Sequence, residues 1–169
     1  MPAPASRAEA LTLRNERRDF TEWHLGRPDY ALWALQFDTR TLLPRLRAAQ
    51  AHMAPWLLAH YTRQPHITLS LCGFPSRTPR HPDDYGLQRF QAQVAALREL
   101  RPQPFEISIG ALDTFSSVPY FSVQEPGGHL QALRHCLDNR ALPAAMDDYT
   151  PHVTVGLYAD AWPLHHMQA

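Results

Sequence analysis

The sequence contains no lysine, since all 16 of its basic residues are arginine. This absence excludes a mechanism that forms a Schiff base or a nucleotidyl adduct on a lysine side chain. It also excludes a P-loop, in which a lysine contacts the phosphates. An ATP-driven ligase that works through a lysyl adduct is therefore excluded as well.

An excess of charge of one sign is also lacking, because 16 acidic residues balance the 16 arginines. The chain therefore has no global basic surface, and we expect no long nucleic-acid duplex as a partner. A small anionic ligand in a local pocket is compatible with this charge. Arginines in the N-terminal segment alternate with acidic residues, which is typical of a solvated helix or arm.

Cysteine is scarce, since Cys72 and Cys136 are the only two and cannot form a disulfide framework. The N-terminus lacks the charged-then-apolar pattern of a signal peptide. No apolar run is long enough to span a membrane. We therefore expect a protein of the reducing cytoplasm without a membrane partner.

The length of 169 residues is typical of one domain, and a hydrophobic content of 44% is enough for a sizeable core. Residues 1–29 are expected to form an arm that packs on a domain of residues 30–158, followed by a tail at 159–169. Asp83 or Asp84 is expected to cap the second helix. Hydrophobic periodicity predicts strands at 30–38, 66–74, 105–112, 118–123 and 151–158, with helices after residues 39, 83 and 128.

Two segments repeat one pattern, namely residues 65–69 (Pro-His-Ile-Thr-Leu) and residues 151–155 (Pro-His-Val-Thr-Val). Because side chains alternate along a strand, each segment presents a histidine and a threonine on one face and apolar residues on the other. By the same alternation, Cys72 and Tyr158 are expected on these polar faces. The two copies lie about half the chain apart, as in a duplicated unit with a pseudo-twofold axis.

The chemistry of such a pair is acid–base catalysis, because the unperturbed pKa of histidine lies near neutral pH. One neutral imidazole deprotonates the attacking water or hydroxyl, and one protonated imidazole donates a proton to the leaving oxygen. In-line displacement at phosphorus needs the two groups on opposite sides, which a twofold-related pair provides. The hydroxyls of Thr68 and Thr154 would bind the non-bridging oxygens as charge develops.

Two competing sites are less favoured by the residue spacing. Zinc needs further ligands from His, Cys, Asp or Glu, and neither motif is His-x-His or His-x-x-x-His. Cys72 lies roughly 20 Å along the strand from His66, too far to share a metal ion. A Ser-His-Asp triad would need a Gly-x-Ser-x-Gly elbow, which the sequence lacks. We therefore expect neither a metal nor a cofactor.

The paired motifs His66-x-Thr68 and His152-x-Thr154 resemble the signature of the 2H phosphoesterase superfamily. Within it they resemble the LigT-like branch of 2′-5′ RNA ligases and RNA 2′,3′-cyclic phosphodiesterases, over roughly residues 30–158. The resemblance implies an α+β fold with two pseudo-twofold lobes, antiparallel sheets, helices on the outer faces and a central cleft. It also implies that neither ATP nor a metal is needed.

The resemblance further implies that His66 and His152 are the acid–base pair, with His152 as the base for cyclic phosphate hydrolysis, and that Thr68 and Thr154 bind phosphate. The expected enzyme is a phosphoric diester hydrolase that acts on 2′,3′-cyclic phosphates of nucleotides or RNA ends. The alternatives are a 2′-5′ phosphodiesterase, a reversible ATP-independent 2′-5′ RNA ligase and a non-catalytic nucleotide-binding module. The sequence gives no oligomeric state.

Three further residues are candidates for substrate binding. Arg63 precedes His66 by three residues and is either a phosphate ligand or a solvated loop arginine. Tyr120 and Tyr158 are each either a base-stacking residue or a core residue. Members of the resembled family begin almost directly at the first strand, so the preceding arm is where substrate choice is expected to differ.

Overall fold

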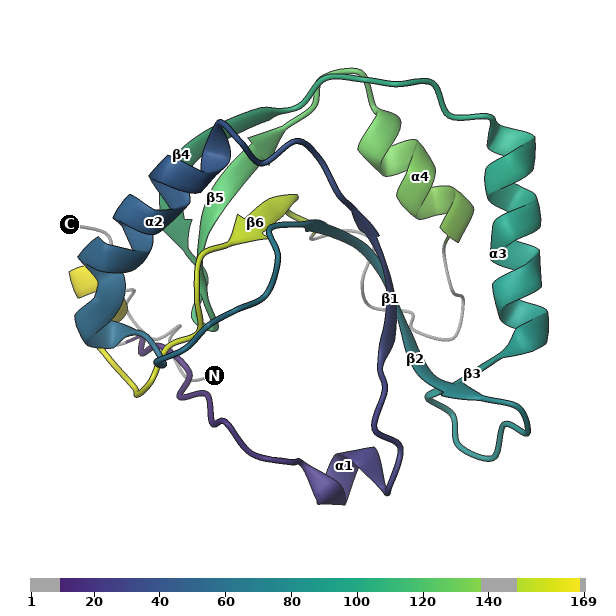
Figure 1. The fold of residues 1–169 in the computed structure, drawn as a ribbon, viewed down its shortest axis with the longest axis horizontal. Coiled ribbons are helices and arrows are strands. Elements are labelled where there is room, and N and C mark those ends of the chain that lie inside the picture. The colour runs from purple at the N-terminus through teal and green to yellow at the C-terminus, as the bar shows by residue number, and fades with distance from the viewer. Residues whose placement is uncertain (1–9, 138–148, 168–169) are drawn as a thin grey trace, which may run out of the picture.

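The computed structural model describes residues 10–137 and 149–167, and within these ranges the fold is α+β, as predicted. Two three-stranded sheets are surrounded by helices (Figure 1). The strands are β1 (Ala31–Leu35), β2 (Ile67–Ser76), β3 (Asp84–Gly86), β4 (Ser108–Thr114), β5 (Pro119–Gln124) and β6 (His152–Thr154). The helices are α1 (Thr21–His24), α2 (Leu42–Met53), α3 (Leu87–Leu100) and α4 (His129–Leu137), with 3-10 turns η1 (Ala54–Trp56) and η2 (Leu164–Met167).

The two sheets differ in the direction of their strands and in the position of the strand next to each motif. The first sheet has the order β1–β2–β3, with β1 antiparallel and β3 parallel to the central strand β2. The second has the order β4–β5–β6 and is antiparallel throughout. The first motif therefore leads into a central strand, whereas the second lies on an edge strand.

Each half of the chain contributes a helix that packs on the sheet of the other half. Helix α2, from the first half, lies beside β4 and β5 (Figure 1). The guanidinium of Arg45 on α2 donates to the carbonyls of Ile109 and Gly110 in β4, at 3.1 and 2.6 Å. Helix α4, from the second half, packs on β2 and on α3.

One apolar core joins both sheets. It contains residues of α2, β2, β5, α4 and the segment around β6, all of which are buried. The helices predicted after residues 39 and 128 are confirmed as α2 and α4, and their buried leucines belong to this core, namely Leu42, Leu46, Leu130, Leu133 and Leu137. No described helix is long and apolar enough to cross a membrane.

The last strand is much shorter than the predicted 151–158. Strand β6 pairs with β5 up to Thr154 opposite Tyr120, and the next residue of β5 is its first, Pro119. Proline has no amide hydrogen, so it accepts from the Val155 amide but cannot donate back to the Val155 carbonyl. That carbonyl instead accepts from the side chain of Gln50 at 3.0 Å. The following residues leave the sheet and pair with residues 56–58.

The predicted alternation along β2 holds over the motif and then breaks. In β1, Leu32 pairs with Leu71 and the preceding Ala31 pairs with Gly73, so Cys72 has no partner and forms a bulge. Cys72 turns inward to 4% exposure, with its Sγ 4.0 Å from Oε1 of Gln93 on α3, while Leu71 is 50% exposed. Placing Cys72 on the polar face was therefore wrong, and burial raises the pKa of its thiol.

The prediction that Asp83 or Asp84 caps the helix after residue 83, which is α3 in the structure, was also wrong. Helix α3 begins at Leu87 after Gly86, and Asp84 lies in β3. The Asp84 carboxylate accepts hydrogen bonds from the amides of Arg80 and His81, at 2.6 and 2.9 Å, and pairs with Arg27. These contacts lower the pKa of Asp84, so the carboxylate stabilises the loop before β3 rather than a helix end.

Candidate active site

The two motifs occupy matching local positions. His66 lies immediately before β2, and His152 is the first residue of β6. The intervening residues Ile67 and Val153 are fully buried, whereas both histidines and both threonines are partly exposed. The alternation predicted for the two motifs is therefore confirmed, and each presents an imidazole and a hydroxyl away from the core.

The fold brings the two motifs together. Strands β2 and β6 contact each other, and the buried residues of both motifs belong to one core cluster. A direct link also joins them, since the hydroxyl of Tyr149 donates to the carbonyl of Thr68 at 2.9 Å. Tyr149 precedes His152 by three residues, so the segment entering the second motif is fastened to the first.

Both imidazoles are held by the same kind of contact. Nδ1 of His66 lies 2.7 Å from the carbonyl oxygen of Gln64, and Nδ1 of His152 lies 2.8 Å from that of Thr150. Because a carbonyl only accepts, each Nδ1 carries the proton of this bond, and each Nε2 is the nitrogen that can accept or donate a further proton.

The repeated proline has a structural role in this contact. In each motif the proline stands between the accepting carbonyl and the histidine, at positions 65 and 151. Its ring fixes the backbone angle φ near −65°, which limits how the preceding carbonyl lies relative to the following side chain. The proline therefore pre-orients the carbonyl that fixes the ring orientation of each histidine.

The surroundings of the two histidines differ. The rings of Phe115 and Tyr120 stack on each other at 4.0 Å, and both meet the His152 ring edge-on, at 5.1 and 5.4 Å. Among the described residues no aromatic ring lies against His66. His152 therefore packs against two aromatic rings in addition to its carbonyl contact, whereas no described aromatic ring packs against His66.

Two of the predicted stacking residues prove to be packing residues. Tyr158 is fully buried, and its hydroxyl forms a hydrogen bond with that of Thr114, so it offers no surface to a base. Tyr120 does lie beside the second motif, paired with Thr154, but it is only 6% exposed and its ring is occupied by Phe115. Tyr120 therefore supports His152 instead of offering a face to substrate.

Arg63 is exposed in the loop that leads to His66, where it lines a pocket together with residues of the N-terminal arm. The part of the chain described by the structure contains no ion-pair partner for it. Its predicted role as a phosphate ligand is therefore compatible with its position.

Sequence reasoning missed Arg134 and the importance of Tyr149. The Arg134 guanidinium lies 3.5 Å above the centre of the Tyr149 ring, and its Nη1 donates to the Leu69 carbonyl at 2.5 Å. Leu69 has no partner in β1, since Thr68 and Ser70 pair with adjacent residues of that strand. The only sequence signal was that Arg134 flanks the apolar stripe of α4.

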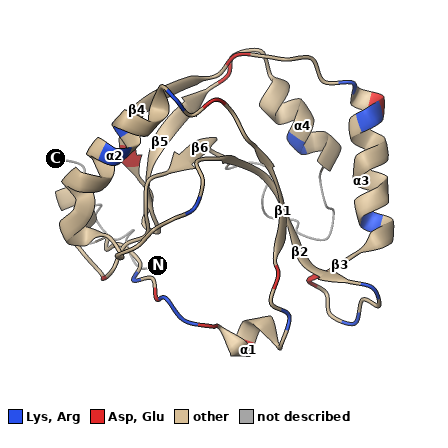
Figure 2. Cartoon of the chain, in the orientation of Figure 1, with Lys and Arg blue, Asp and Glu red and all other residues tan. Residues whose placement is uncertain are grey.

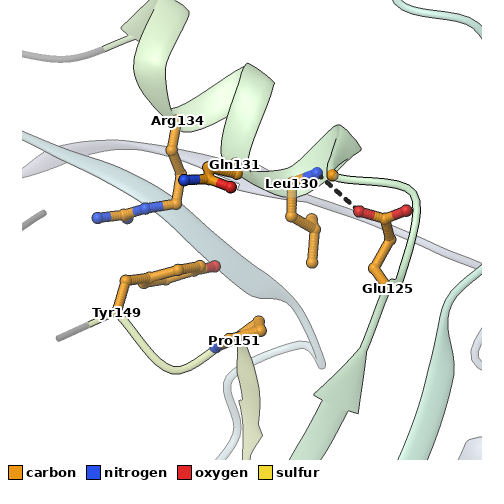
Figure 3. Close-up of a pocket in the computed structure, with 7 residues that line it drawn as sticks. Glu125, Leu130, Gln131, Arg134, Tyr149 and Pro151 are labelled. Carbon is orange, nitrogen blue, oxygen red and sulfur yellow. Dashed lines mark hydrogen bonds between the residues drawn. The ribbon is translucent and has the colours of Figure 1, made fainter. Parts of the chain in front are cut away.

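A pocket of about 350 Å³ lies between the start of α4 and residues 149–151 (Figure 3). Its carboxylate, Glu125, already accepts from the amides of Gly127 and Leu130 and from Nδ1 of His129, at 2.7, 3.1 and 2.8 Å. The contact with His129 is the main cause of the lowered pKa of Glu125. Because Arg134 and Glu125 are both engaged, this pocket supports the segment before His152 and offers no free acid or base.

The described residues contain no group of three or more His, Cys, Asp or Glu side chains placed to hold a metal ion. This finding concerns geometry only. Within the described residues, the Nε2 atoms of the two imidazoles form no hydrogen bond, and a threonine lies two residues after each histidine on the same face of its strand.

Comparison with known protein families gives a clear result. Residues 38–169 match the 2′-5′ RNA ligase superfamily, which is most of the chain. The chain belongs to the 2′-5′ RNA ligase superfamily, in agreement with the predicted resemblance to LigT-like 2H phosphoesterases. No curated protein and no solved structure gives a significant match. The arm and β1 precede the matched residues.

Proposed function

We propose that this protein is a metal-independent phosphodiesterase that hydrolyses 2′,3′-cyclic phosphates of nucleotides or RNA ends. The observation that carries the proposal is the matched pair of Nδ1–carbonyl contacts at His66 and His152. Such contacts fix the tautomer of each ring and leave Nε2 to exchange protons. Membership of a phosphoester-handling superfamily supports the same chemistry.

The proposed reaction is an in-line displacement at phosphorus. The Nε2 of neutral His152 takes a proton from water as the water oxygen bonds to phosphorus. The bond from phosphorus to one ribose oxygen breaks, and protonated His66 donates its Nε2 proton to that oxygen. The products are a phosphomonoester, a protonated His152 and a neutral His66, and proton exchange with solvent restores the starting state. The hydroxyls of Thr68 and Thr154 donate to the non-bridging oxygens as charge develops on them.

The test is hydrolysis of a 2′,3′-cyclic nucleotide with EDTA present. His66→Ala and His152→Ala should each lower kcat about 10²- to 10⁴-fold, which is typical for loss of one general acid or base. His135→Ala is the matched control, because His135 is an exposed histidine of α4. Full activity in both single variants would refute the assignment of the pair.

A second activity is favoured by the name of the superfamily itself, which describes 2′-5′ RNA ligases. The same acid and base would join RNA ends without ATP if a 5′-hydroxyl replaced water as the nucleophile. The base would take the proton of that hydroxyl as its oxygen bonds to phosphorus, and the acid would protonate the 3′ oxygen as its bond to phosphorus breaks, which leaves a 2′-5′ linkage. Analysis of products from 2′-5′-linked and cyclic substrates distinguishes the two activities. Tight nucleotide binding without turnover of either substrate would instead favour a non-catalytic binding module.

A further inference from the structure

The N-terminal arm, described from residue 10 onwards, contacts both halves of the chain. At its start, Leu11 bridges Pro163, and the Thr12 amide donates to the Trp162 carbonyl at 2.8 Å. The Asn15 amide donates to the Tyr158 carbonyl at 2.9 Å. Residues 11–15 are therefore held by the second half of the chain, next to the end of the last strand.

The other end of the arm is held by the first sheet. Arg27 forms ion pairs with Asp83 and Asp84, at 2.7 and 2.6 Å, and its guanidinium lies 4.0 Å from the centre of the Phe74 ring. The ring of Trp23 packs against Phe74 at 5.1 Å. Between these anchors, the chain crosses from one half to the other below the two sheets and enters α1 (Figure 1).

A pocket of about 380 Å³ lies between this crossing segment and the loop of residues 58–63. The arm contributes Arg17, Phe20 and Trp23 to it, and the loop contributes Tyr61 and Arg63. The loop leads directly into the first motif, since Arg63 precedes His66 by three residues. Leu157, three residues beyond Thr154, also lines the pocket. The pocket is therefore lined by the segment that leads into the first motif and by the segment that leaves the second, although no residue of either motif is among its lining residues.

The lining is locally basic although the whole chain has no net charge. Three arginines and one glutamate line the pocket, and Arg18 is engaged by Glu16 and Glu22. Within residues 10–137 and 149–167, neither Arg17 nor Arg63 has an ion-pair partner. Along the arm as a whole, basic and acidic segments alternate (Figure 2), so the basic character is confined to the pocket lining. Two guanidinium groups are thus available to an anion at the pocket.

The lining also offers aromatic surface. Trp23 is 49% exposed even though one part of its ring packs on Phe74. Tyr61 is partly exposed on the opposite wall. Aromatic rings beside unpaired arginines are the combination with which proteins bind single-stranded nucleic acid, by base stacking and by contacts to phosphate. The pocket volume is within the range of small-molecule sites.

We propose that this pocket binds the nucleotide adjacent to the one that carries the reacting phosphate. An aromatic side chain of the pocket stacks the base, and Arg17 and Arg63 contact the phosphodiester that links the two nucleotides. The inference rests on the proposed function, and it adds that the preferred substrate is a short single-stranded RNA end and not a mononucleotide. Arg17 and Trp23 precede residues 38–169, which match the superfamily, so the arm's part of this subsite lies outside the region that the superfamily match covers.

The test measures binding without turnover. A 5′-labelled trinucleotide with a 3′-phosphate and the corresponding nucleoside 3′-phosphate are titrated against wild type, Arg17→Ala and Trp23→Ala. Both variants should weaken trinucleotide binding, Trp23→Ala by roughly five- to a hundredfold if it carries the stacked base. The slope of log K against log salt should fall by about 0.7 in Arg17→Ala, as for loss of one phosphate contact on a single strand.

Arg14→Ala is the matched control, because Arg14 is an exposed arginine of the same arm that does not line the pocket. It should bind both ligands as wild type does. Binding of the mononucleotide should be unchanged in all variants. Arg17 is exposed and its loss leaves the fold intact, so wild-type trinucleotide affinity in Arg17→Ala would overturn the proposal, as would equal losses for both ligands.

Hydrolysis assays separate this inference from the proposed function. If wild type hydrolyses cyclic phosphates and trinucleotide binding is insensitive to both substitutions, the subsite is wrong and the function stands. If wild type hydrolyses neither substrate and trinucleotide binding still depends on Arg17 and Trp23, the subsite stands and the proposed function is wrong.

Discussion

Removing the hydroxyl of Tyr149 tests whether the distance between the two motifs is set by one hydrogen bond. Tyr149→Phe deletes the donor to the Thr68 carbonyl and keeps the ring that lies under Arg134. Burial raises the pKa of Tyr149, so its hydroxyl keeps its proton at neutral pH and is a donor in the native protein. The substitution therefore changes one contact and little else.

The expected loss of stability follows from that single bond. A hydrogen bond of this kind contributes about 1 kcal/mol to the free energy of unfolding. For a chain of this size, the melting temperature should fall by about 2–4 °C. Urea unfolding measures the first quantity and a thermal melt the second.

The expected loss of activity is larger than the loss of stability implies. The segment 149–151 carries the Thr150 carbonyl that orients His152, so a looser segment moves Nε2 relative to the first motif. Because a displacement of 1 Å at a reacting group can cost a hundredfold, a shift of a fraction of that distance should lower kcat about three- to tenfold. KM should change little, since no substrate contact is removed.

Tyr30→Phe is the control, because the Tyr30 hydroxyl donates to no described residue and its ring packs on Phe74. Kinetics are measured at 25 °C, well below the melting temperature of each variant. A lowered stability of Tyr149→Phe with unchanged kcat would refute the positioning argument and leave a purely structural bond. Unchanged stability and unchanged kcat would show that the bond contributes nothing.

Two further predictions concern the fold. Gln93→Ala leaves the Trp33 indole and the Tyr85 hydroxyl without their shared acceptor, and it leaves the Leu137 carbonyl without its donor. The free energy of unfolding, measured with urea, should therefore fall by about 2–4 kcal/mol. A fall of less than about 1 kcal/mol would mean that water replaces the lost amide. Asp84→Asn should destabilise the protein at pH 7 and have less effect at pH 3. The pKa of Asp84 is lowered in the folded state, so the charged carboxylate stabilises the fold above its ordinary pKa of 3.8, and this stabilisation is lost as the pH falls towards the lowered folded-state pKa. An equal loss of unfolding free energy at pH 7 and pH 3 would contradict a contribution from the charged carboxylate.

The parts that could be predicted from sequence depend on local periodicity. The burial of Ile67 and Val153 next to partly exposed histidines follows from strand alternation within three residues, and no distant contact changes it. The apolar stripe of α4 is likewise a local signal. The family match over residues 38–169 agrees with the resemblance inferred from the motif pair.

The parts that could not be predicted depend on partners far away in sequence. The bulge at Cys72 exists because β1 pairs with β2 in a shifted register, which no local pattern encodes. Strand β6 ends early because its neighbour begins at Pro119. The hydroxyl of Tyr149 reaches Thr68 from 81 residues away, so its importance for the site had no sequence signal.

The exchange of helices between the two halves has a consequence for how the chain folds. Because α2 covers β4 and β5 while α4 packs on β2, neither half can bury its own sheet completely before the other half has been made, although α3 packs on part of the first sheet from within the first half. Native contacts therefore join residues far apart in sequence, and such contacts slow folding because long loops must close first. A chain cut between α3 and β4 should give two fragments that are each unfolded alone and regain structure only when mixed. The chain should therefore fold as a single cooperative unit, and loss of either half should disrupt the contacts that hold His66 and His152.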